Sequence, residues 1–249
     1  MALPEFTTLQ WIIAIIAGLL VGLSKSGFAG MGVFTVLLMA MIIPPRESTG
    51  TVLPLLLAGD CLAVWYFRHH ANWYQIRRLL APAVVGVLIG FVLMPMISDT
   101  SFGRVIGILM VLIILIQYLV RWIKLAEQNL PRSHTFAWGM GISAGIATML
   151  ANLAGPIMII YLLAQRLPKY EFVATGAVYY LIINLFKIPF SAALGLIDGG
   201  SILLNLILLP TVVFGFFIGR AFLKKIPQKW FEEIVLFLAL LGALRLIWL

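Results

Sequence analysis

Hydrophobic runs, separated by short segments rich in polar residues, glycine or proline, extend over almost the whole chain. The boundaries carry turn or charge signals, such as Pro44-Pro45 and Gly199-Gly200, which are typical of helix ends. The pattern predicts ten apolar helical segments, at residues 8–23, 29–43, 50–68, 77–97, 103–122, 136–150, 155–167, 171–190, 201–219 and 231–248.

The lengths of these segments fall into two groups. A helix needs about 20 residues, at about 1.5 Å each, to cross the roughly 30 Å hydrocarbon core of a membrane. The first two segments of each half, at 8–23, 29–43, 136–150 and 155–167, are shorter than this, and the other six are long enough. Each short pair is therefore a candidate for a helical hairpin whose tip stops inside the membrane.

The composition indicates that this helical protein is a membrane protein. The chain is 63% hydrophobic and only 10% charged, with a mean hydropathy of +1.10, whereas about a quarter of the residues of a soluble domain are charged. We therefore predict an all-α, polytopic integral membrane protein. The start, MALPEFTT, has no basic region, so a cleavable signal peptide is not expected. The single Cys61 excludes a disulfide within one chain.

The chain has a net charge of +8, and its positively charged residues lie mainly in short loops. There they set the orientation in the membrane and do not indicate a nucleic-acid partner. The clearly basic loops run from Arg68 to Arg78, from Arg121 to Arg132 and from Arg220 to Lys229. Even numbers of segments separate them, so all three can be cytoplasmic, with the N-terminus outside. Five segments per half then make the two halves antiparallel.

Glycine and proline positions of the first half recur in the second. Thr49-Gly50 recurs as Thr175-Gly176, and a longer set recurs 123 positions later: Gly18, Gly22, Gly32 and Pro45 as Gly141, Gly145, Gly155 and Pro168. In so apolar a chain, a repeat with matched helix breaks indicates a secondary transporter built as an inverted repeat. We assign residues 1–126 to the first membrane repeat and 127–249 to the second, within one transmembrane domain.

Both predicted hairpin tips are polar and rich in small residues. Irregular backbone inside a membrane needs protein or a water-filled cavity to satisfy its amides, and glycine lets that backbone approach an anion. Gly-x-x-x-Gly spacings also mark close helix packing, and we assign packing to the pairs Gly18/Gly22, Gly86/Gly90, Gly141/Gly145 and Gly215/Gly219. We assign cavity lining to Gly30, Gly32, Asn152 and Gly155.

The first tip, with Gly22, Gly27, Gly30 and Gly32 followed by an apolar helix and Pro45, resembles the glycine-rich repeat of the TauE/SafE family of sulfite and sulfonate transporters, also called the toluene sulfonate uptake permeases. The resemblance covers essentially the whole chain. The second tip departs from the pattern, since Leu153 and Ala154 stand where glycines are usual. The resemblance implies passage of sulfite or an organosulfonate such as sulfoacetate, often outward, across a bacterial inner membrane.

Three ionisable residues lie deep in predicted segments, where each costs several kcal/mol unless it is paired or functional. Lys25 suits a sulfite or sulfonate as a point charge, or else reaches the cytoplasmic interface. Lys187 is a candidate for a site or gate, or for a structural ion pair. Asp60 is expected to pair with Lys187 or Lys25, and could instead carry a proton coupled to anion movement.

The remaining candidates are neutral polar residues. Asn184 lies one helical turn before Lys187 and shares its face, whereas Thr49, Thr51 and Thr175 begin the third segment of their half and could simply cap it. The predicted substrate-binding set is Ser24, Lys25, Ser26, Gly30, Gly32, Thr49, Asn152, Gly155, Thr175, Asn184 and Lys187, with Asp60 for coupling or charge pairing.

The sequence thus favours a secondary anion transporter that alternates access around the two tips. It has no phosphate-binding loop, no nucleophile–base pair and no metal-ligand spacing around His69, His70 or His134, so we expect no enzyme activity, metal or cofactor. An anion channel or a non-transporting scaffold or assembly protein is the alternative. The expected partners are a small anion and membrane lipid, with a homodimer as one candidate assembly.

Overall fold

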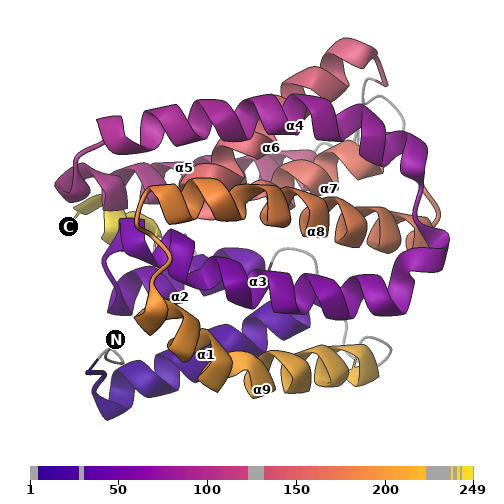
Figure 1. Cartoon of the computed structure of the whole chain (residues 1–249). Helices are drawn as coiled ribbons and strands as arrows, with labels where there is room; N and C mark the ends of the chain where they lie inside the picture. Colours follow the sequence, from indigo (N-terminus) through magenta and orange to yellow (C-terminus); the bar gives the residue numbers. More distant parts are fainter. Residues whose placement is uncertain are drawn as a thin grey trace.

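A computed structural model describes residues 5–27, 31–122, 132–222, 237, 240–241 and 243–248. These residues form helices and no strand, which confirms the all-α prediction (Figure 1). The helices are α1 (Thr8–Lys25), α2 (Gly32–Ile42), α3 (Pro45–Phe67), α4 (Trp73–Leu93), α5 (Asp99–Trp122), α6 (His134–Ala151), α7 (Ala154–Ala164), α8 (Lys169–Ala193) and α9 (Gly199–Phe222), with short 3₁₀ turns η1 (Arg68–His70) and η2 (Met94–Met96).

Six helices of the described part are long and apolar enough to span a membrane. Five lie at the predicted segments 50–68, 77–97, 103–122, 171–190 and 201–219. The sixth is α1. We predicted that the segment at 8–23 is too short to span a membrane, and this prediction was wrong. The 18 residues of α1 reach Lys25, because Thr7 and Gln10 cap its start reciprocally and the polar Ser24 and Lys25 still continue the helix. Half of the tenth predicted segment, at 231–248, lies outside the described residues.

Two very short helices lie where the hairpins were predicted. α2 and α7 each have 11 residues, or about 16 Å of rise, too little to cross a membrane. Each follows an 18-residue helix, α1 or α6, and packs against it. Each half therefore contains a hairpin of one longer and one very short helix.

Contacts between helix ends show which ends lie together. The Asn72 N–H before α4 donates to Thr175 Oγ1 of α8 at 3.0 Å. Arg78 of α4 donates to the Arg132 carbonyl before α6, and Arg132 donates to the Ala164 carbonyl that ends α7. The described parts of the first two basic loops therefore lie at one end of the bundle, on the right in Figure 1.

The opposite end joins the starts of α3 and α5. Arg46 Nε lies 2.7 Å from Asp99 Oδ1, and the same guanidinium donates to the Ile97 carbonyl. Gly50 of α3 lies directly against Leu196, which follows α8. In Figure 1, helices α3, α4, α5, α8 and α9 run between these two ends, and the N-terminus lies at this second end.

Glycines set the closest helix crossings. A Cβ on Gly22 of α1 would lie 2.9 Å from the Gly215 carbonyl carbon of α9, and one on Gly86 of α4 would lie 2.9 Å from Gly145 Cα of α6. The predicted packing role of these glycines is therefore confirmed. Each hairpin is held tightly by a long helix of the other half.

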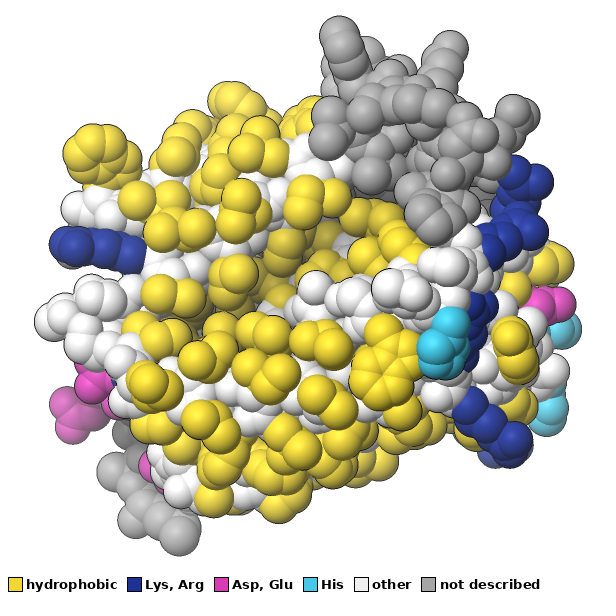
Figure 2. All heavy atoms as spheres, turned by 90° about the horizontal axis from the view of Figure 1, so that it is seen from above, with side chains coloured by type: hydrophobic (Ala, Val, Ile, Leu, Met, Phe, Trp, Pro, Cys, Tyr) yellow, Lys and Arg dark blue, Asp and Glu magenta, His cyan; other side chains and the backbone are white. Residues whose placement is uncertain are grey.

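The outer surface matches a lipid environment. Large side chains such as Leu88, Leu112, Leu206 and Phe214 are exposed on α4, α5 and α9. In Figure 2 hydrophobic side chains cover the middle of the face shown, and Lys and Arg gather mainly toward its right-hand end. Helices α3 and α8 pack against each other at the centre of the bundle, and they carry the buried polar residues described next.

Candidate functional site

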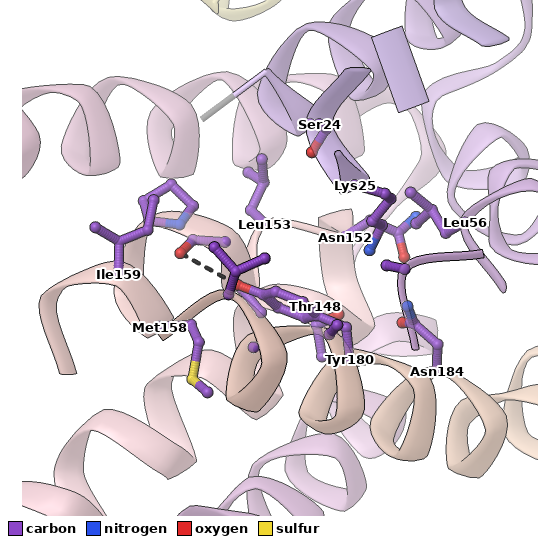
Figure 3. Close-up of a pocket in the computed structure, with 18 of the residues that line it drawn as sticks. Ser24, Lys25, Leu56, Thr148, Asn152, Leu153, Met158, Ile159, Tyr180 and Asn184 are labelled. Atoms are coloured by element: carbon purple, nitrogen blue, oxygen red, sulfur yellow. Dashed lines mark hydrogen bonds between the residues drawn. The ribbon is translucent and has the colours of Figure 1, made fainter. Parts of the chain in front are cut away.

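A cavity lies between the end of α1, the start of α2, the α6–α7 turn and α8 (Figure 3). It has about 120 Å³ of room for the centres of water-sized molecules, which is enough for several waters or a small anion. Its polar side chains are those of Ser24, Lys25, Thr148, Asn152, Tyr180 and Asn184. Apolar lining includes Leu56, Met158, Ile159, Leu162, Phe172 and Val173.

Lys25 reaches from the last turn of α1 to the buried Asp60 of α3. Its Nζ lies 2.5 Å from Asp60 Oδ1, and the Lys25 side chain is 11% exposed whereas that of Asp60 is 0% exposed. Asn184 Nδ2 of α8 donates to Asp60 Oδ2 at 2.7 Å. Both carboxylate oxygens therefore have a partner, and Lys25, which lines the cavity, is the cation within reach of an anion there.

Tyr180 connects the two hairpins. The Lys25 Nζ lies 4.6 Å from the centroid of the Tyr180 ring, a cation–π arrangement that stabilises the ammonium. The hydroxyl of the same tyrosine donates to the Gly155 carbonyl at the start of α7, at 3.4 Å. One side chain of α8 therefore contacts the cation of the first hairpin and the backbone of the second.

The second hairpin turns at Asn152, which has a left-handed backbone (φ 55°). Asparagine tolerates this conformation at a helix C-terminus better than other non-glycine residues. The turn also depends on the Asn152 side chain, whose Nδ2 donates to the Thr49 carbonyl of α3 at 2.8 Å. In the first hairpin the left-handed position is Gly27, with φ 118°.

Lys187 of α8 supports this turn from behind the cavity. Its Nζ donates to Asn152 Oδ1 at 2.5 Å and to Thr148 Oγ1 at 3.2 Å, and the residue is 1% exposed. Because Thr148 accepts from Lys187, its own O–H remains free to donate. Thr148 lines the cavity, so this hydroxyl is a ready donor for an oxyanion.

A family model described as "Sulfite exporter TauE/SafE" matches residues 13–246. The chain belongs to the TauE/SafE family. Searches of curated proteins and of solved structures gave no match. Together with the six long apolar helices, the family establishes a multi-pass membrane transporter of the sulfite-exporter type.

The structure of this TauE/SafE protein brings most of the predicted site residues together. Lys25 and Asp60 form the ion pair, which resolves the choice of partner in favour of Lys25. Lys187 is hydrogen bonded to neutral side chains and forms no salt bridge within the described residues. The predicted residues that line the cavity are Ser24, Lys25, Gly32, Asn152, Gly155 and Asn184.

Several predicted residues lie elsewhere. Ser26 donates its hydroxyl to the Leu23 carbonyl and lies against Gly219 of α9. Thr175 accepts a hydrogen bond at the helix end near Asn72, and Thr49 contributes only its backbone carbonyl, since its hydroxyl donates to the Arg46 carbonyl. Gly30 lies outside the described residues.

The idea that the threonines cap their helices was wrong. Helix α3 begins at Pro45 and α8 at Lys169, so Thr49, Thr51 and Thr175 lie inside these helices. Thr51, like Thr49, donates its hydroxyl to a carbonyl one turn earlier, that of Glu47. Prolines at the start of these segments allowed the helices to begin earlier than the apolar pattern suggested.

Sequence reasoning missed Tyr180 and Thr148 in the TauE/SafE site. The signal for Tyr180 was its spacing, because Gly176, Tyr180, Asn184 and Lys187 recur every three or four residues and so share one face of α8. Thr148 lies one turn before Asn152 on α6, and a hydroxyl near a predicted hairpin tip was a candidate for the same cavity.

Proposed function

We propose that this TauE/SafE protein is a secondary transporter that carries sulfite or an organosulfonate, such as sulfoacetate or isethionate, through the cavity between its two hairpins. The observation that carries the proposal is the Lys25 ammonium, which lines the cavity beneath the tips of both hairpins and faces hydrogen-bond donors from both halves. The three oxygens of a sulfonate can accept from Lys25, Ser24 and Thr148, which all line the cavity, because charge-assisted hydrogen bonds favour an anionic acceptor.

The cavity has a polar and an apolar side. In Figure 3, Lys25, Asn152 and Asn184 lie toward one side and Met158 and Ile159 toward the other. An amphipathic anion fits such a cavity, with its oxyanion at the lysine and its hydrocarbon part against Met158 and Ile159. This favours a small organosulfonate over an inorganic anion that is polar on every side.

The charges of the site favour anions over zwitterions. Lys25 and Lys187 are the buried cations of this cluster and Asp60 is its carboxylate. Since Asp60 neutralises one lysine, a protonated Lys187 leaves a positive field at Asn152 and Thr148. Taurine carries an ammonium where isethionate carries a hydroxyl, so it has no net charge and gains less from this positive field. Taurine should therefore bind more weakly than isethionate.

The arrangement of the halves supports alternating access. α1 is locked to α9 and α4 to α6 by glycine contacts, so each hairpin can move together with a long helix of the other half. The two hairpins enter from opposite ends and meet at the cavity, as an inverted repeat requires. We place the end with Arg78 and Arg132 in the cytoplasm of a bacterial cell, with export as the expected direction.

The test measures exchange of labelled isethionate by the full chain in liposomes. A carrier should exchange external label against unlabelled isethionate inside, whereas a channel gains nothing from unlabelled anion on the far side. Lys25→Ala with Asp60→Asn removes the ion pair without leaving a buried charge, and should abolish exchange.

The matched control removes the chain's other described ion pair, with Arg46→Ala and Asp99→Asn. Exchange should continue in this control. Exchange at the original rate without Lys25 would contradict the proposed site. A screen by thermal shift with sulfite, thiosulfate, sulfoacetate, isethionate, taurine and sulfate then ranks the substrates. Stabilisation by taurine as strong as that by isethionate would contradict the charge argument.

A further inference from the structure

The cavity lysine is not free in this structure. Its Nζ lies 2.5 Å from Asp60 Oδ1, and the Asp60 side chain is fully buried on α3. An anion that enters the cavity therefore meets a cation that already has a carboxylate partner. Binding of the anion must change the balance of charge around Asp60.

The Asp60 carboxylate and a bound anion cannot both be compensated by Lys25 alone at this depth without a large cost in free energy. Removing water from a carboxylate costs several kcal/mol unless a cation compensates it, and removal of the partner from a buried pair is strongly unfavourable. If the anion takes Lys25, the Asp60 carboxylate loses that compensation. Uptake of a proton by Asp60 removes the unpaired charge.

Asn184 can satisfy Asp60 in both protonation states. Its Nδ2 now donates to Asp60 Oδ2 at 2.7 Å. A side-chain amide carries both donors and an acceptor, so rotation of the Asn184 amide by half a turn presents its oxygen to a protonated Asp60. Asp60 can therefore keep a hydrogen bond in either state, which a leucine at position 184 would not allow.

The other titratable groups near Asp60 are few. α1 contributes Lys25, α8 contributes Tyr180 and Lys187, and α3 itself contributes Cys61, the next residue. Of the further helices packed against α3, α2 has no titratable residue, and α6 and α9 have only His134 and Arg220, at the bundle end away from Asp99. α5 carries Asp99 and Arg104 near the other end, and Tyr118 and Arg121 toward its C-terminus. The 3₁₀ turn η1, which follows α3, carries the exposed Arg68, His69 and His70 at the basic end.

Within the described residues, the second half has no buried carboxylate that matches Asp60. Thr148 lies 123 positions after Lys25, which is the offset that relates Gly22 to Gly145. Lys187 lies 127 positions after Asp60, close to the offset of 126 that relates Thr49-Gly50 to Thr175-Gly176. The structure shows the corresponding contact, from Lys187 Nζ to Thr148 Oγ1. The first half thus pairs two charges that can exchange a proton with water, whereas the second pairs a lysine with a hydroxyl.

We propose that Asp60 binds a proton when an anion occupies Lys25, so that the anion and one proton cross the membrane together. The step forms one O–H bond on Asp60, with the proton taken from water through the cavity. On release of the anion at the other face, the proton returns to water and Asp60 pairs with Lys25 again. This inference rests on the proposed function, and it makes the translocated pair electrically neutral.

The test measures isethionate affinity of the purified full chain between about pH 5.5 and about pH 8.5. Isethionic acid is a strong acid, so isethionate stays a monoanion over this range, whereas sulfite would itself titrate. One linked proton predicts a rise in Kd of about tenfold per pH unit where Asp60 is ionised. Asp60→Asn, which mimics the protonated carboxyl, should bind with an affinity that does not change with pH.

Two variants separate Asp60 from other groups. Asp99→Asn removes the carboxylate of the other ion pair, where Asp99 is 83% exposed, and should leave the pH slope unchanged. Lys187→Met should weaken binding and keep the slope, because Lys187 is not the group that takes up the proton. Loss of the slope in Lys187→Met but not in Asp60→Asn would overturn the proposal.

A transport measurement completes the test. In liposomes with a pH-sensitive dye inside, an inward isethionate gradient should acidify the lumen with the original protein, and Asp60→Asn should exchange isethionate without acidification. Binding without any pH slope would overturn the proton inference and leave the proposed function standing. Failure of every screened anion to bind would overturn both.

Discussion

The two hairpins face one cavity from opposite ends of the bundle, and their turns differ in chemistry. At the first, Lys25 projects from α1 to Asp60 of α3. At the second, the neutral Asn152 and Thr148 accept from Lys187 of α8. The cation therefore lies on the hairpin in one half and on the central helix in the other.

The backbone devices of the two hairpins are much more alike. Each has an 18-residue helix and an 11-residue helix, and the described part of each turn contains a residue with positive φ, Gly27 or Asn152. Each hairpin is also held by glycines against a long helix of the other half. The comparison teaches that the two hairpins share their backbone geometry and differ in where their charged side chains lie. Within the described residues, the ion pair at the cavity lies in the first half, and the proposed proton coupling depends on this difference.

The largest effect is expected from a substitution that upsets the charge balance of the first half. Lys25→Ala leaves Asp60 buried without its cation and should lower the free energy of unfolding by about 3–5 kcal/mol near neutral pH. Adding Asp60→Asn should restore most of this loss, because no charge is then left unpaired. Unfolding in mixed micelles measures both. A double variant as unstable as the single one would show that the lysine acts through packing.

The second prediction concerns the cation of the other half. Lys187→Ala removes the donor that orients Thr148 and Asn152, and should weaken anion binding about tenfold to a hundredfold, corresponding to ~1.5–3 kcal/mol. Arg68→Ala, at an exposed position of the basic end, should leave the Kd unchanged. Titration calorimetry with isethionate compares them. A folded Lys187→Ala variant with the original affinity would remove Lys187 from the site.

The structure explains how much of this comparison the sequence could predict. Lys25, Asn152 and Asn184 could be assigned because a polar residue in so apolar a chain needs a partner or a cavity. The partner of Asp60 could not, since it depends on how α3 is rotated toward α1 and α8. Ser26 and Thr175 were misplaced because hydroxyls often bond to nearby or facing backbone groups instead of a ligand.

The third prediction separates packing glycines from cavity glycines. In Gly86→Ala the new Cβ would lie 2.9 Å from Gly145 Cα, and such overpacking should lower the free energy of unfolding by about 1–3 kcal/mol. In Gly155→Ala the nearest atom would be the Tyr180 hydroxyl oxygen, at 4.0 Å, so stability should be retained. Melting temperatures without ligand check the contrast, and equal losses at both positions would remove it.

The smallest expected effect is at the start of α9. The backbone N–H and hydroxyl of Ser201 hold the pKa of Asp198 below its ordinary value, and the N–H donates to Asp198 Oδ1 at 2.7 Å. This stabilisation is therefore present above about pH 4 and is lost as the pH falls through the lower folded value. Asp198→Asn should keep the helix start near neutral pH and flatten the acid dependence of the melting temperature. A melting temperature that depends on acidic pH in Asp198→Asn just as in the original protein would contradict the role of Asp198.

The central claim is that both hairpin tips line one anion site, and one measurement tests it most directly. Gly32 and Gly155 line the cavity from the two halves, and a methyl group on either would meet nothing closer than 3.4 Å, so it would project into the space for the anion. The account predicts that Gly32→Ala and Gly155→Ala each keep their melting temperature without ligand and lose most of the thermal stabilisation by isethionate. Gly86→Ala should show the reverse, a lower melting temperature with the stabilisation kept. Full stabilisation of both tip variants by isethionate would contradict the account.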